Sequence, residues 1–248
     1  MPLAFGCNPD HWDPRDIHVC ALELPKSKCH ELVLPYDRPV RDQVGGSCVG
    51  NSICHAIELY ADLHGVTCPR LSAQYLYTLS RWSVSPSGYD GVVDSGTSIR
   101  TAYKTLSRWG ICVEGLWESD PTTLNKEPSA MAKLDAADRY GELGELSYHR
   151  ATWMSDIDSA LDAGMPCVLG LPVDEAWYTH DGVRPLREPT GGTVGNHAVV
   201  GCGRTGDGDL VILNSWGERW GVGGRGVVAR DYVSKRAFDI WTGRLRWT

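Results

Sequence analysis

The sequence lacks the features of several large classes of protein. No apolar run approaches the roughly 20 residues that a helix needs to span a bilayer. No run of Lys or Arg could follow the phosphates of a nucleic acid, and the formal net charge is −7. The first residues do not place a basic segment before an apolar one, so they do not form a signal peptide. We therefore expect no membrane and no nucleic acid as partners, with the cytoplasm as the default location unless a leader has been removed.

The sequence also lacks a pattern that would bind a metal. It contains no Cys-x-x-Cys, and its histidines do not stand at zinc-ligand spacings from its cysteines. Asp207 and Asp209 could suggest calcium, but a hairpin turn is the better interpretation of this Gly-rich stretch. The nine cysteines are expected to be reduced thiols in the absence of a secretion signal, whereas oxidation of all but one would suit an exported enzyme. We expect neither a metal nor a cofactor.

The predicted secondary structure changes along the chain, from mostly helices to mostly strands. The 248 residues, 42% hydrophobic and 22% charged, are ordinary for a soluble globular protein with one large or two modest cores. Apolar residues at helical spacing predict helices near 47–64, 72–82, 98–109, 130–140 and 155–163. Ser47, Ser72 and Ser155 are placed to cap three of them. Strand-like runs follow at 166–173, 197–202, 210–213 and 226–229.

These changes predict four segments. Residues 1–35 are expected to form an N-terminal arm or lead-in segment, and 36–145 a helical domain that carries the first reactive motif. Residues 146–235 are expected to form a β-rich domain. Residues 236–248 form a C-terminal tail, whose Trp241 and Trp247 favour docking against the body. A site built from both domains must lie between them, where pockets commonly occur.

The most informative residues form three short motifs. Gly45-Gly46-Ser47-Cys48 places a thiol at the start of a predicted buried helix, where the positive end of the helix dipole favours the thiolate. Asn196-His197-Ala198-Val199 begins an apolar strand with an imidazole, and Asn214 ends another strand 17 residues later. A strand–turn–strand of that length can bring the last two side by side, so that the carboxamide oxygen accepts a ring N–H and orients the histidine.

Four roles in catalysis follow from these motifs. Cys48 is predicted to be the nucleophile, His197 the acid and base, and Asn214 the orienter, while Gln43 could donate to an oxyanion. Trp216, with a second tryptophan four residues later, is expected to cover the His–Asn hydrogen bond and exclude water. Alone, a cysteine or a histidine in such a context is most often a buried structural residue. The cysteine, the histidine and the asparagine together predict nucleophilic catalysis by a thiol.

In order and approximate spacing, the motifs resemble the active-site segments of the papain-like (C1-type) cysteine peptidases. The matching segments are Gln43…Gly46-Ser47-Cys48, Asn196-His197-Ala198-Val199 and Asn214-Ser215-Trp216-Gly217. Weaker stretches at Leu71–Leu76 and Asp94–Arg100 are similar to segments of bacterial and viral members. Fewer than 50 residues precede Cys48, so the resemblance favours members that lack a long pro-segment. It covers roughly residues 34–233.

The resemblance implies an α+β, papain-like two-domain fold. In it a helical left domain and a β-barrel-like right domain face each other across the active-site cleft. It also implies a cysteine-type peptidase that hydrolyses peptide bonds through a thioester acyl-enzyme, with the backbone N–H of Cys48 as a further oxyanion donor. Gly96 is expected to pair with an extended peptide substrate, and Ala198 to line its pocket. The expected partners are a peptide or protein substrate and either a proteinaceous inhibitor or the protein's own N-terminal segment, with the protein itself a monomer.

The chain departs from the family pattern around the nucleophile. The family usually separates the glutamine from the cysteine by six residues, and here Gln43 stands five before Cys48. The usual half-cystine before the nucleophile is absent, and Val49 replaces the usual aromatic residue after it. Either the loop is tighter than in the family or Gln43 is displaced from the position of an oxyanion donor.

Two other functions stay open at this point. One is a Cys-His acyl transferase, or an amide or cell-wall peptide hydrolase, but such enzymes commonly use Asp or His in the place of Asn214. The other is an inactive papain-like binding module, although such proteins usually lose the nucleophile or the base and this chain keeps both.

Overall fold

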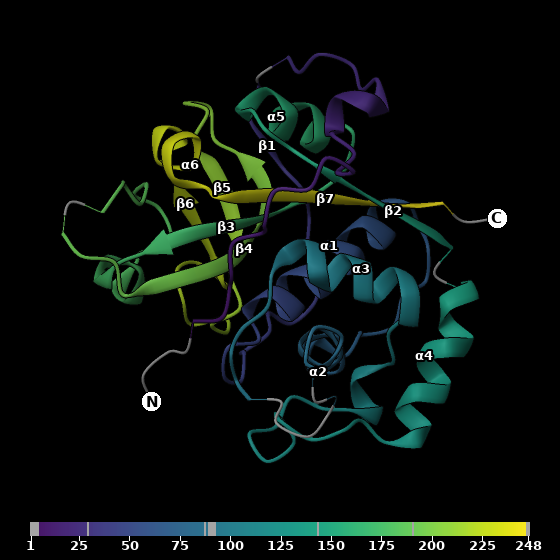
Figure 1. The fold of residues 1–248 in the computed structure, drawn as a ribbon. Coiled ribbons are helices and arrows are strands. Elements are labelled where there is room, and N and C mark those ends of the chain that lie inside the picture. The colour runs from purple at the N-terminus through teal and green to yellow at the C-terminus, as the bar shows by residue number, and fades with distance from the viewer. Residues whose placement is uncertain are drawn as a thin grey trace.

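The helices of the first half of the chain gather on one side of the molecule, and the strands lie on the other together with the later helices (Figure 1). The computed structural model describes residues 5–28, 30–86, 88, 93–142, 144–189 and 191–246. Its α-helices are α1 Cys48–Leu63, α2 Ala73–Trp82, α3 Ile99–Trp109, α4 Ala130–Glu142, α5 Met154–Asp162 and α6 Arg230–Arg236. Short 3-10 helices are η1 Val19–Leu22, η2 Glu114–Leu116 and η3 Glu175–Thr179. The strands are β1 Leu32–Val33, β2 Glu145–Arg150, β3 Cys167–Val173, β4 Gly195–Arg204, β5 Leu210–Leu213, β6 Arg225–Val228 and β7 Asp239–Arg246. The predicted α+β class is confirmed.

The helices form where the apolar spacing predicts them. Residues Cys48–Ala61 of α1 are all buried, because β4 packs on one side of this helix and α2 and α3 pack on another. Gly50 permits the approach of α2, since a Cβ at this position would stand 2.5 Å from the carbonyl oxygen of Ala73. The start of α2 is capped as predicted, because the Ser72 hydroxyl accepts the backbone N–H of Tyr75.

Two predicted caps are wrong. The Ser47 side chain makes no capping bond to α1; its hydroxyl instead donates to the carbonyl of Val44 at 2.7 Å and accepts from Asn51 at 2.9 Å. The N-cap of α5 is Trp153 rather than Ser155, and Asp156 in the first turn accepts the N–H of Trp153 at 2.9 Å. At α1 the hydroxyl is engaged by other partners, whereas at α5 the carboxylate of Asp156 takes the place of the predicted hydroxyl.

The strands form one antiparallel sheet in the order β2-β7-β3-β4-β5-β6, with β1 against β4. Every residue of β3 and β5 is buried, which explains why these strands appear in the sequence as continuous apolar runs. Strands β4 and β5 form a hairpin through the Gly-rich turn at 205–209. This hairpin brings the chain at 197 and the chain at 214 to the same end of the sheet.

The longer elements that escaped the sequence-based prediction are β2, β7 and α6, and the two-residue strand β1 and the short 3-10 helices were not predicted either. The missed strand β7 comes from the segment expected to dock as a tail, and it lies between β2 and β3 with Trp241 fully buried. Its charged and glycine residues hid the strand pattern. Trp247 lies outside the described residues. The domain boundaries at 36–145 and 146–235 stay a prediction.

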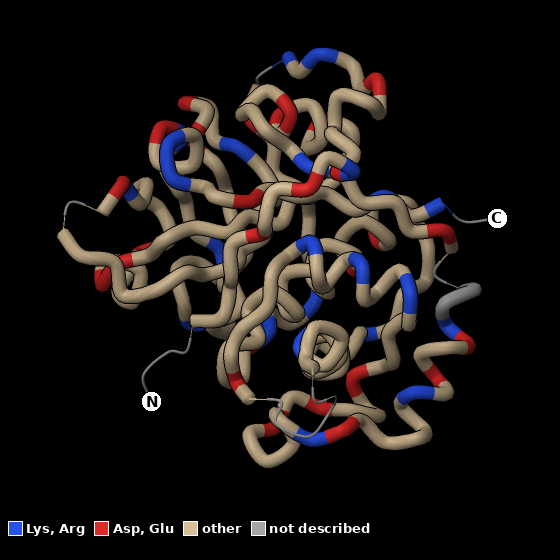
Figure 2. Tube along the Cα trace, viewed as in Figure 1, with Lys and Arg blue, Asp and Glu red and all other residues tan. Residues whose placement is uncertain are grey.

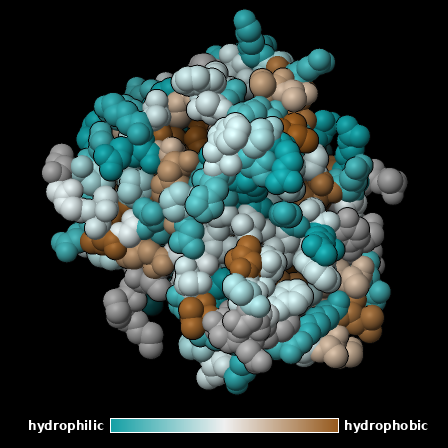
Figure 3. Space-filling view, viewed as in Figure 1, coloured by the Kyte–Doolittle hydropathy of each residue, from teal (hydrophilic) through white to brown (hydrophobic). Residues whose placement is uncertain are grey.

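The surface is mixed in charge and in polarity. Acidic and basic residues alternate over the visible trace, and hydrophobic residues form small separate patches on the visible face (Figures 2 and 3). Within the described residues, no helix is both long enough and apolar enough to cross a membrane.

Candidate active site

Cys48 is the first residue of α1, a helix of 16 residues whose N-terminal backbone N–H groups favour a negative charge on the sulfur. The preceding turn requires glycine: Gly45 has a φ of +57°, and the N–H of Gly46 donates to the Asp94 carboxylate at 3.0 Å. The Tyr77 hydroxyl donates to the same carboxylate at 2.5 Å. The turn is therefore held by side chains of α2 and of the 93–98 loop, which fixes where the thiol stands.

His197 and Asn214 meet at the end of the β4–β5 hairpin. The two side chains are joined by a hydrogen bond of 2.7 Å between Nε2 of the histidine and Oδ1 of the asparagine. The same oxygen accepts the backbone N–H of Ser215 at 2.8 Å, so it is an acceptor and Nε2 carries the proton. Nδ1 of His197 is buried and has no hydrogen-bond partner among the described residues. In the neutral ring this nitrogen is the basic one.

Three tryptophans surround this pair. Trp216 stacks on the His197 ring at a centroid distance of 4.6 Å, in the covering position expected from the sequence. Trp220 crosses Trp216 at 6.0 Å, and its indole N–H donates to the carbonyl of Trp177 at 2.6 Å. Trp177, fully buried in η3, meets the edge of His197 at 6.2 Å. The sequence analysis missed Trp177, since no motif surrounds it.

Gln43 lies on a loop that is paired with the segment after Asn214. Its backbone N–H donates to the carbonyl of Ser215 at 2.8 Å, and its Oε1 accepts the Ser215 hydroxyl at 2.7 Å. Its Nε2 donates to the carbonyl of Gly45 at 3.0 Å, in the turn that leads to Cys48. The shortened loop therefore keeps Gln43 between the His–Asn end of the sheet and the turn before α1. The neighbouring Arg41 is anchored by a buried ion pair with Glu58 of α1.

The N-terminal segment runs between the helices and the sheet and crosses the site. In Figure 1 this purple segment rises from the N-terminus along the boundary between β4 and α1. Thr97 donates its N–H to the carbonyl of Gly6 at 2.9 Å, and the N–H of Asn8 donates to the carbonyl of Thr97 at 2.9 Å, a parallel bridge. On the other side, the N–H of Cys7 donates to the carbonyl of Asn196 at 3.3 Å. We call residues 5–17 the arm.

The arm fits because Gly6 has no side chain. A Cβ at Gly6 would stand 1.9 Å from the carbonyl oxygen of Gly46, far inside any real contact distance. Gly96 has a φ of +75°, and a Cβ there would stand 2.6 Å from the carbonyl oxygen of Gly6. Gly96 and Thr97 thus form one wall beside the arm, while Ala198, whose backbone N–H faces the Cys48 sulfur, is buried on the other side.

Under the arm, the two reactive groups are shielded from water. Burial raises the pKa of the Cys48 thiol to about 11, and the backbone N–H groups of Ala198 and Gly6 offset only part of this increase. Burial also lowers the pKa of His197 to about 4, against the hydrogen bond to Asn214, which raises it. At neutral pH both groups are therefore uncharged while the arm is docked, and an uncharged thiol is a weak nucleophile.

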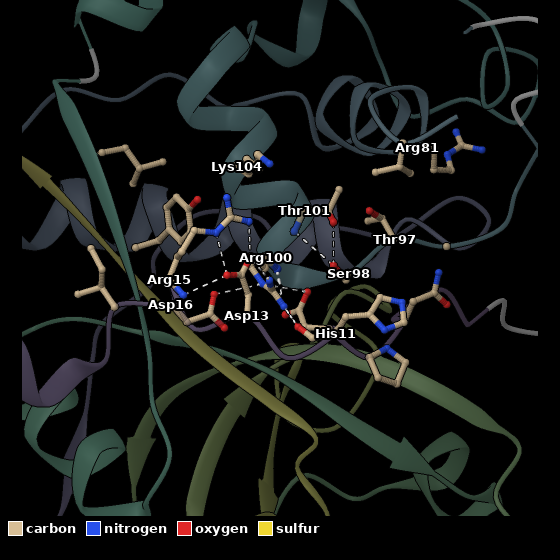
Figure 4. Close-up of a pocket in the computed structure, with 18 of the residues that line it drawn as sticks. His11, Asp13, Arg15, Asp16, Arg81, Thr97, Ser98, Arg100, Thr101 and Lys104 are labelled. Atoms are coloured by element: carbon tan, nitrogen blue, oxygen red, sulfur yellow. Dashed lines mark hydrogen bonds and ion pairs between the residues drawn. The ribbon is translucent and has the colours of Figure 1, made fainter. Parts of the chain in front are cut away.

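Charged side chains fasten the arm to the body beyond the reactive residues. Arg100, at the start of α3, donates to the carbonyl of His11 and lies 3.3 Å from Asp13 and 3.4 Å from Asp16. Figure 4 shows these groups around a cavity of about 810 Å³ between the arm and α3. Deeper in, the N–H of Asp10 donates to the buried carboxylate of Asp239 at 2.6 Å.

Asp239 makes stability depend on pH in a definite direction. Burial, reinforced by the charge of Asp10, raises the pKa of the Asp239 carboxyl from 3.8 to about 7, although Arg150 lies 2.5 Å away. Because the folded-state value is the higher one, the contribution of the protonated group is fully present below about pH 4 and is lost as the pH rises through about 7. Between pH 5 and pH 8 the parent should lose free energy of unfolding as Asp239 deprotonates. The Asp239→Asn variant should lose less over the same interval, by on the order of 1–2 kcal/mol.

Urea unfolding at the two pH values measures this difference. The exposed Asp231→Asn variant serves as the control and should keep the pH dependence of the parent. Equal pH slopes for the parent and for Asp239→Asn would contradict the assignment.

The described residues contain no group of three or more His, Cys, Asp or Glu arranged to hold a metal ion. The described cysteines, which exclude Cys29, are all free thiols. A thiol on α1 and an imidazole–carboxamide pair on the β4–β5 hairpin are the groups that the predicted roles invoke.

A helical half with a cysteine at a helix start, against an antiparallel sheet with a His–Asn pair under tryptophan, is the architecture of papain-like proteins. No family model matches the chain. A curated relative, an uncharacterized peptidase C1-like protein of Acanthamoeba polyphaga mimivirus, is 29% identical over 210 residues. The match covers 79% of this chain, and this chain spans 66% of that protein's length, slightly less than two thirds.

Solved structures of cysteine proteases also resemble this chain. Xylellain, a cysteine protease from Xylella fastidiosa, is 26% identical with a TM-score of 0.81, over 98% of this chain and 96% of that one. Bromelain protease from Ananas comosus, solved with the E64 inhibitor, has a TM-score of 0.63 at 19% identity, over 94% and 100% of the two chains. Procathepsin B S9 from Trypanosoma congolense has 0.67 at 17% identity, over 97% and 87%. The last two show the fold alone. In sequence and in fold, the chain is similar to the papain-like, C1-type cysteine peptidases, which are hydrolases.

Proposed function

We propose that the protein hydrolyses peptide bonds through a thioester acyl-enzyme formed on Cys48, with His197 as acid and base and Asn214 as the orienter of the histidine. The observation that carries this proposal is the 2.7 Å bond between His197 Nε2 and Asn214 Oδ1, which leaves Nδ1 of the buried ring as its basic nitrogen. A thiol at a helix N-terminus with such an imidazole beside it is the arrangement of an activated cysteine nucleophile.

The steps follow from the positions of the groups. Nδ1 of His197 takes the thiol proton, and the Cys48 sulfur attacks the carbonyl carbon of the substrate. The negative oxygen of the tetrahedral intermediate accepts from the backbone N–H of Cys48 and from the side-chain amide of Gln43, whose oxygen is held by Ser215 at 2.7 Å. The imidazolium then protonates the leaving amine, and a water molecule, deprotonated by the same ring, releases the acid and restores the thiol. Trp216 keeps bulk water from the His–Asn bond.

We propose that a substrate lies where the arm lies in this structure. The arm is extended and exchanges backbone hydrogen bonds with Thr97, next to Gly96, while its other edge bonds to Asn196. An extended peptide could make the same backbone bonds beside Gly96, and Ala198 would line its path next to the nucleophile. The division of labour between a helical domain, 36–145, and a β-rich domain, 146–235, belongs to the same proposal.

The structure is then a resting state in which the protein's own arm is the inhibitor. Substrate and arm need the same backbone donors and acceptors at Thr97, so they cannot bind together. Activity requires that the arm leave, which also rehydrates Cys48 and His197. Burial under the docked arm therefore accounts for the shifted pKa values of Cys48 and His197, and their proposed catalytic roles stay the same.

A labelling experiment tests the proposed function. An epoxide inhibitor of cysteine peptidases is expected to modify Cys48 once the arm has been displaced, and the Cys48→Ala variant is expected to lose peptide hydrolysis down to the uncatalysed background. The matched control is Cys54→Ala, which removes a buried thiol two turns further along the same helix and should keep activity. Cleavage of a peptide library that persists in purified Cys48→Ala would exclude the proposal.

A further inference from the structure

The arm contains a second cysteine, Cys7, which lies next to the arm residue that packs beside Cys48. Cys7 is almost fully buried, and its backbone is held on both sides, by the parallel bridge to Thr97 and by the bond to Asn196. Its sulfur packs over Gly170 of β3, 3.0 Å from the point that a Cβ there would occupy. Gly170 pairs in register with Ala198, whose N–H faces the Cys48 sulfur. The side chain of Cys7 therefore packs on β3, against the residue that pairs across the sheet with the residue facing Cys48.

The neighbouring residue of the arm touches the nucleophile itself. Gly6 packs against the carbonyl of Gly46, and that carbonyl oxygen lies 4.0 Å from the Cys48 sulfur. The N–H of Gly6 faces the same sulfur. Burial raises the pKa of the Cys7 thiol, and a charge on Cys48 adds to that increase.

Two other cysteines, on the same N-terminal segment and on the same helix, are less well placed for Cys48. Cys20, further along the N-terminal segment, is exposed in η1, which packs against α5. Cys54 lies six residues along α1, about 9 Å along the helix axis at the usual rise per residue. A disulfide needs Cα atoms about 4.4–6.8 Å apart, a range that rigid helix geometry denies to Cys48 and Cys54. The arm, in contrast, is a chain segment that can shift against the body.

We propose that Cys7 is a resolving cysteine, which traps an oxidised Cys48 as a reversible disulfide between the arm and the body. The oxidant is a hydroperoxide. When the arm lifts, the Cys48 thiolate attacks the peroxide, the O–O bond breaks, and sulfenic acid forms on Cys48 with release of water or alcohol. When the arm docks again, the Cys7 thiol attacks that sulfur, the S–S bond forms and water leaves. With hydrogen peroxide, two thiols lose two electrons to the peroxide, and two waters are produced.

The disulfide would protect the Cys48 sulfur from further oxidation and would hold the arm covalently over the site. A sulfenic acid that finds no thiol proceeds to sulfinic acid, which a dithiol does not reduce. The disulfide stops this second oxidation and keeps the arm over the site until a dithiol reductant cleaves it. The proposal rests on the proposed function only in taking Cys48 as the reactive thiol, and the epoxide test above examines that point separately.

The experiment treats the full chain with hydrogen peroxide at neutral pH, blocks the remaining thiols, and maps disulfides by tandem mass spectrometry without reduction. Trypsin places Cys7 in the peptide 1–15 and Cys48 in the peptide 42–70, which also holds Cys54 and Cys68, so fragment ions must assign the linked sulfur. We expect the link at Cys48, and we expect dithiothreitol to restore both thiols and the activity.

Two variants test whether the effect depends on Cys7 or on any cysteine of the N-terminal segment. In Cys7→Ser the same treatment should leave Cys48 as sulfinic acid, with activity that dithiothreitol no longer restores. Cys20→Ser, at the exposed cysteine of the same N-terminal segment, should behave as the parent does. The proposal is overturned if Cys48 joins another cysteine, becomes sulfinic acid in the parent, or stays unmodified by peroxide. Epoxide labelling of Cys48 in that event would leave the proposed function standing.

Discussion

Replacing Gly6 by valine is expected to expose Cys48 and make it reactive at neutral pH. Any side chain at Gly6 would collide with the carbonyl of Gly46, at 1.9 Å for the Cβ alone, so the arm cannot dock beside the nucleophile. Water then reaches the sulfur, and its pKa should fall from about 11 toward the ordinary value of 9.0 or below. The thiolate fraction at pH 7 should rise about a hundredfold, and the lower basicity of that thiolate leaves a gain of roughly tenfold in alkylation rate.

Iodoacetamide labelling from pH 6 to pH 11, quantified on the peptide that contains Cys48, measures this change. The parent should show its inflection near pH 11, and Gly6→Val a lower one together with faster peptide hydrolysis. Gly115→Val is the matched control, because a Cβ at Gly115 meets nothing within 4 Å and the residue lies in η2, away from the arm. If Gly6→Val and Gly115→Val are labelled at the rate of the parent, the arm does not shield Cys48.

Replacing His197 by alanine is expected to reduce kcat/KM of the Gly6→Val protein by about 10⁴ or more. In the proposed mechanism the histidine both takes the proton of Cys48 and returns it to the leaving amine. Removing one member of such a catalytic unit abolishes most of the rate enhancement of the whole unit. Asn214→Ala should lose less, because it removes only the 2.7 Å bond that holds the ring in place. The pH profile separates the two roles: Asn214→Ala should shift the acid limb of kcat/KM, whereas His197→Ala should abolish that limb.

His30→Ala provides the comparison for this series, since its side chain is exposed at the far end of β4, near Arg204. It should match the activity of the background protein. A value of kcat/KM for His197→Ala within tenfold of the background would remove the histidine from the mechanism, whatever its distance from Asn214. Circular dichroism of each variant checks that a lost side chain has not unfolded the hairpin.

Much of the site was predictable because its residues sit in local contexts with a physical meaning. A Gly-Gly-Ser turn before an apolar helix marks a buried helix start, and α1 begins at Cys48. An apolar strand, a Gly-rich turn and a second strand predict a hairpin, and the hairpin forms with His197 and Asn214 side by side. The indole after Asn214 is part of the same local segment, and it stacks on the ring of the histidine.

The failures come from elements whose role depends on distant neighbours. Strand β7 contains Asp239 and Gly243, which do not favour a strand, yet β2 and β3 satisfy its backbone from both sides. Trp177 belongs to a short 3-10 helix with no distinctive motif, and only packing brings it to His197. Ser47 has the right position for a cap, but the tighter Gln43–Cys48 loop offers its hydroxyl the carbonyl of Val44 instead.

The sequence by itself determined the chemistry: a thiol at the start of a helix, an imidazole on a strand and a carboxamide to orient it, because these depend on residue type and short-range pattern. Only the tertiary structure decided that the arm lies across Cys48, since a backbone bridge between residues 7 and 97 leaves no periodic signal in either segment. The same contact bears on the protonation of the site, because burial, which no local pattern encodes, raises the pKa of the Cys48 thiol and lowers that of the His197 ring while the arm is docked.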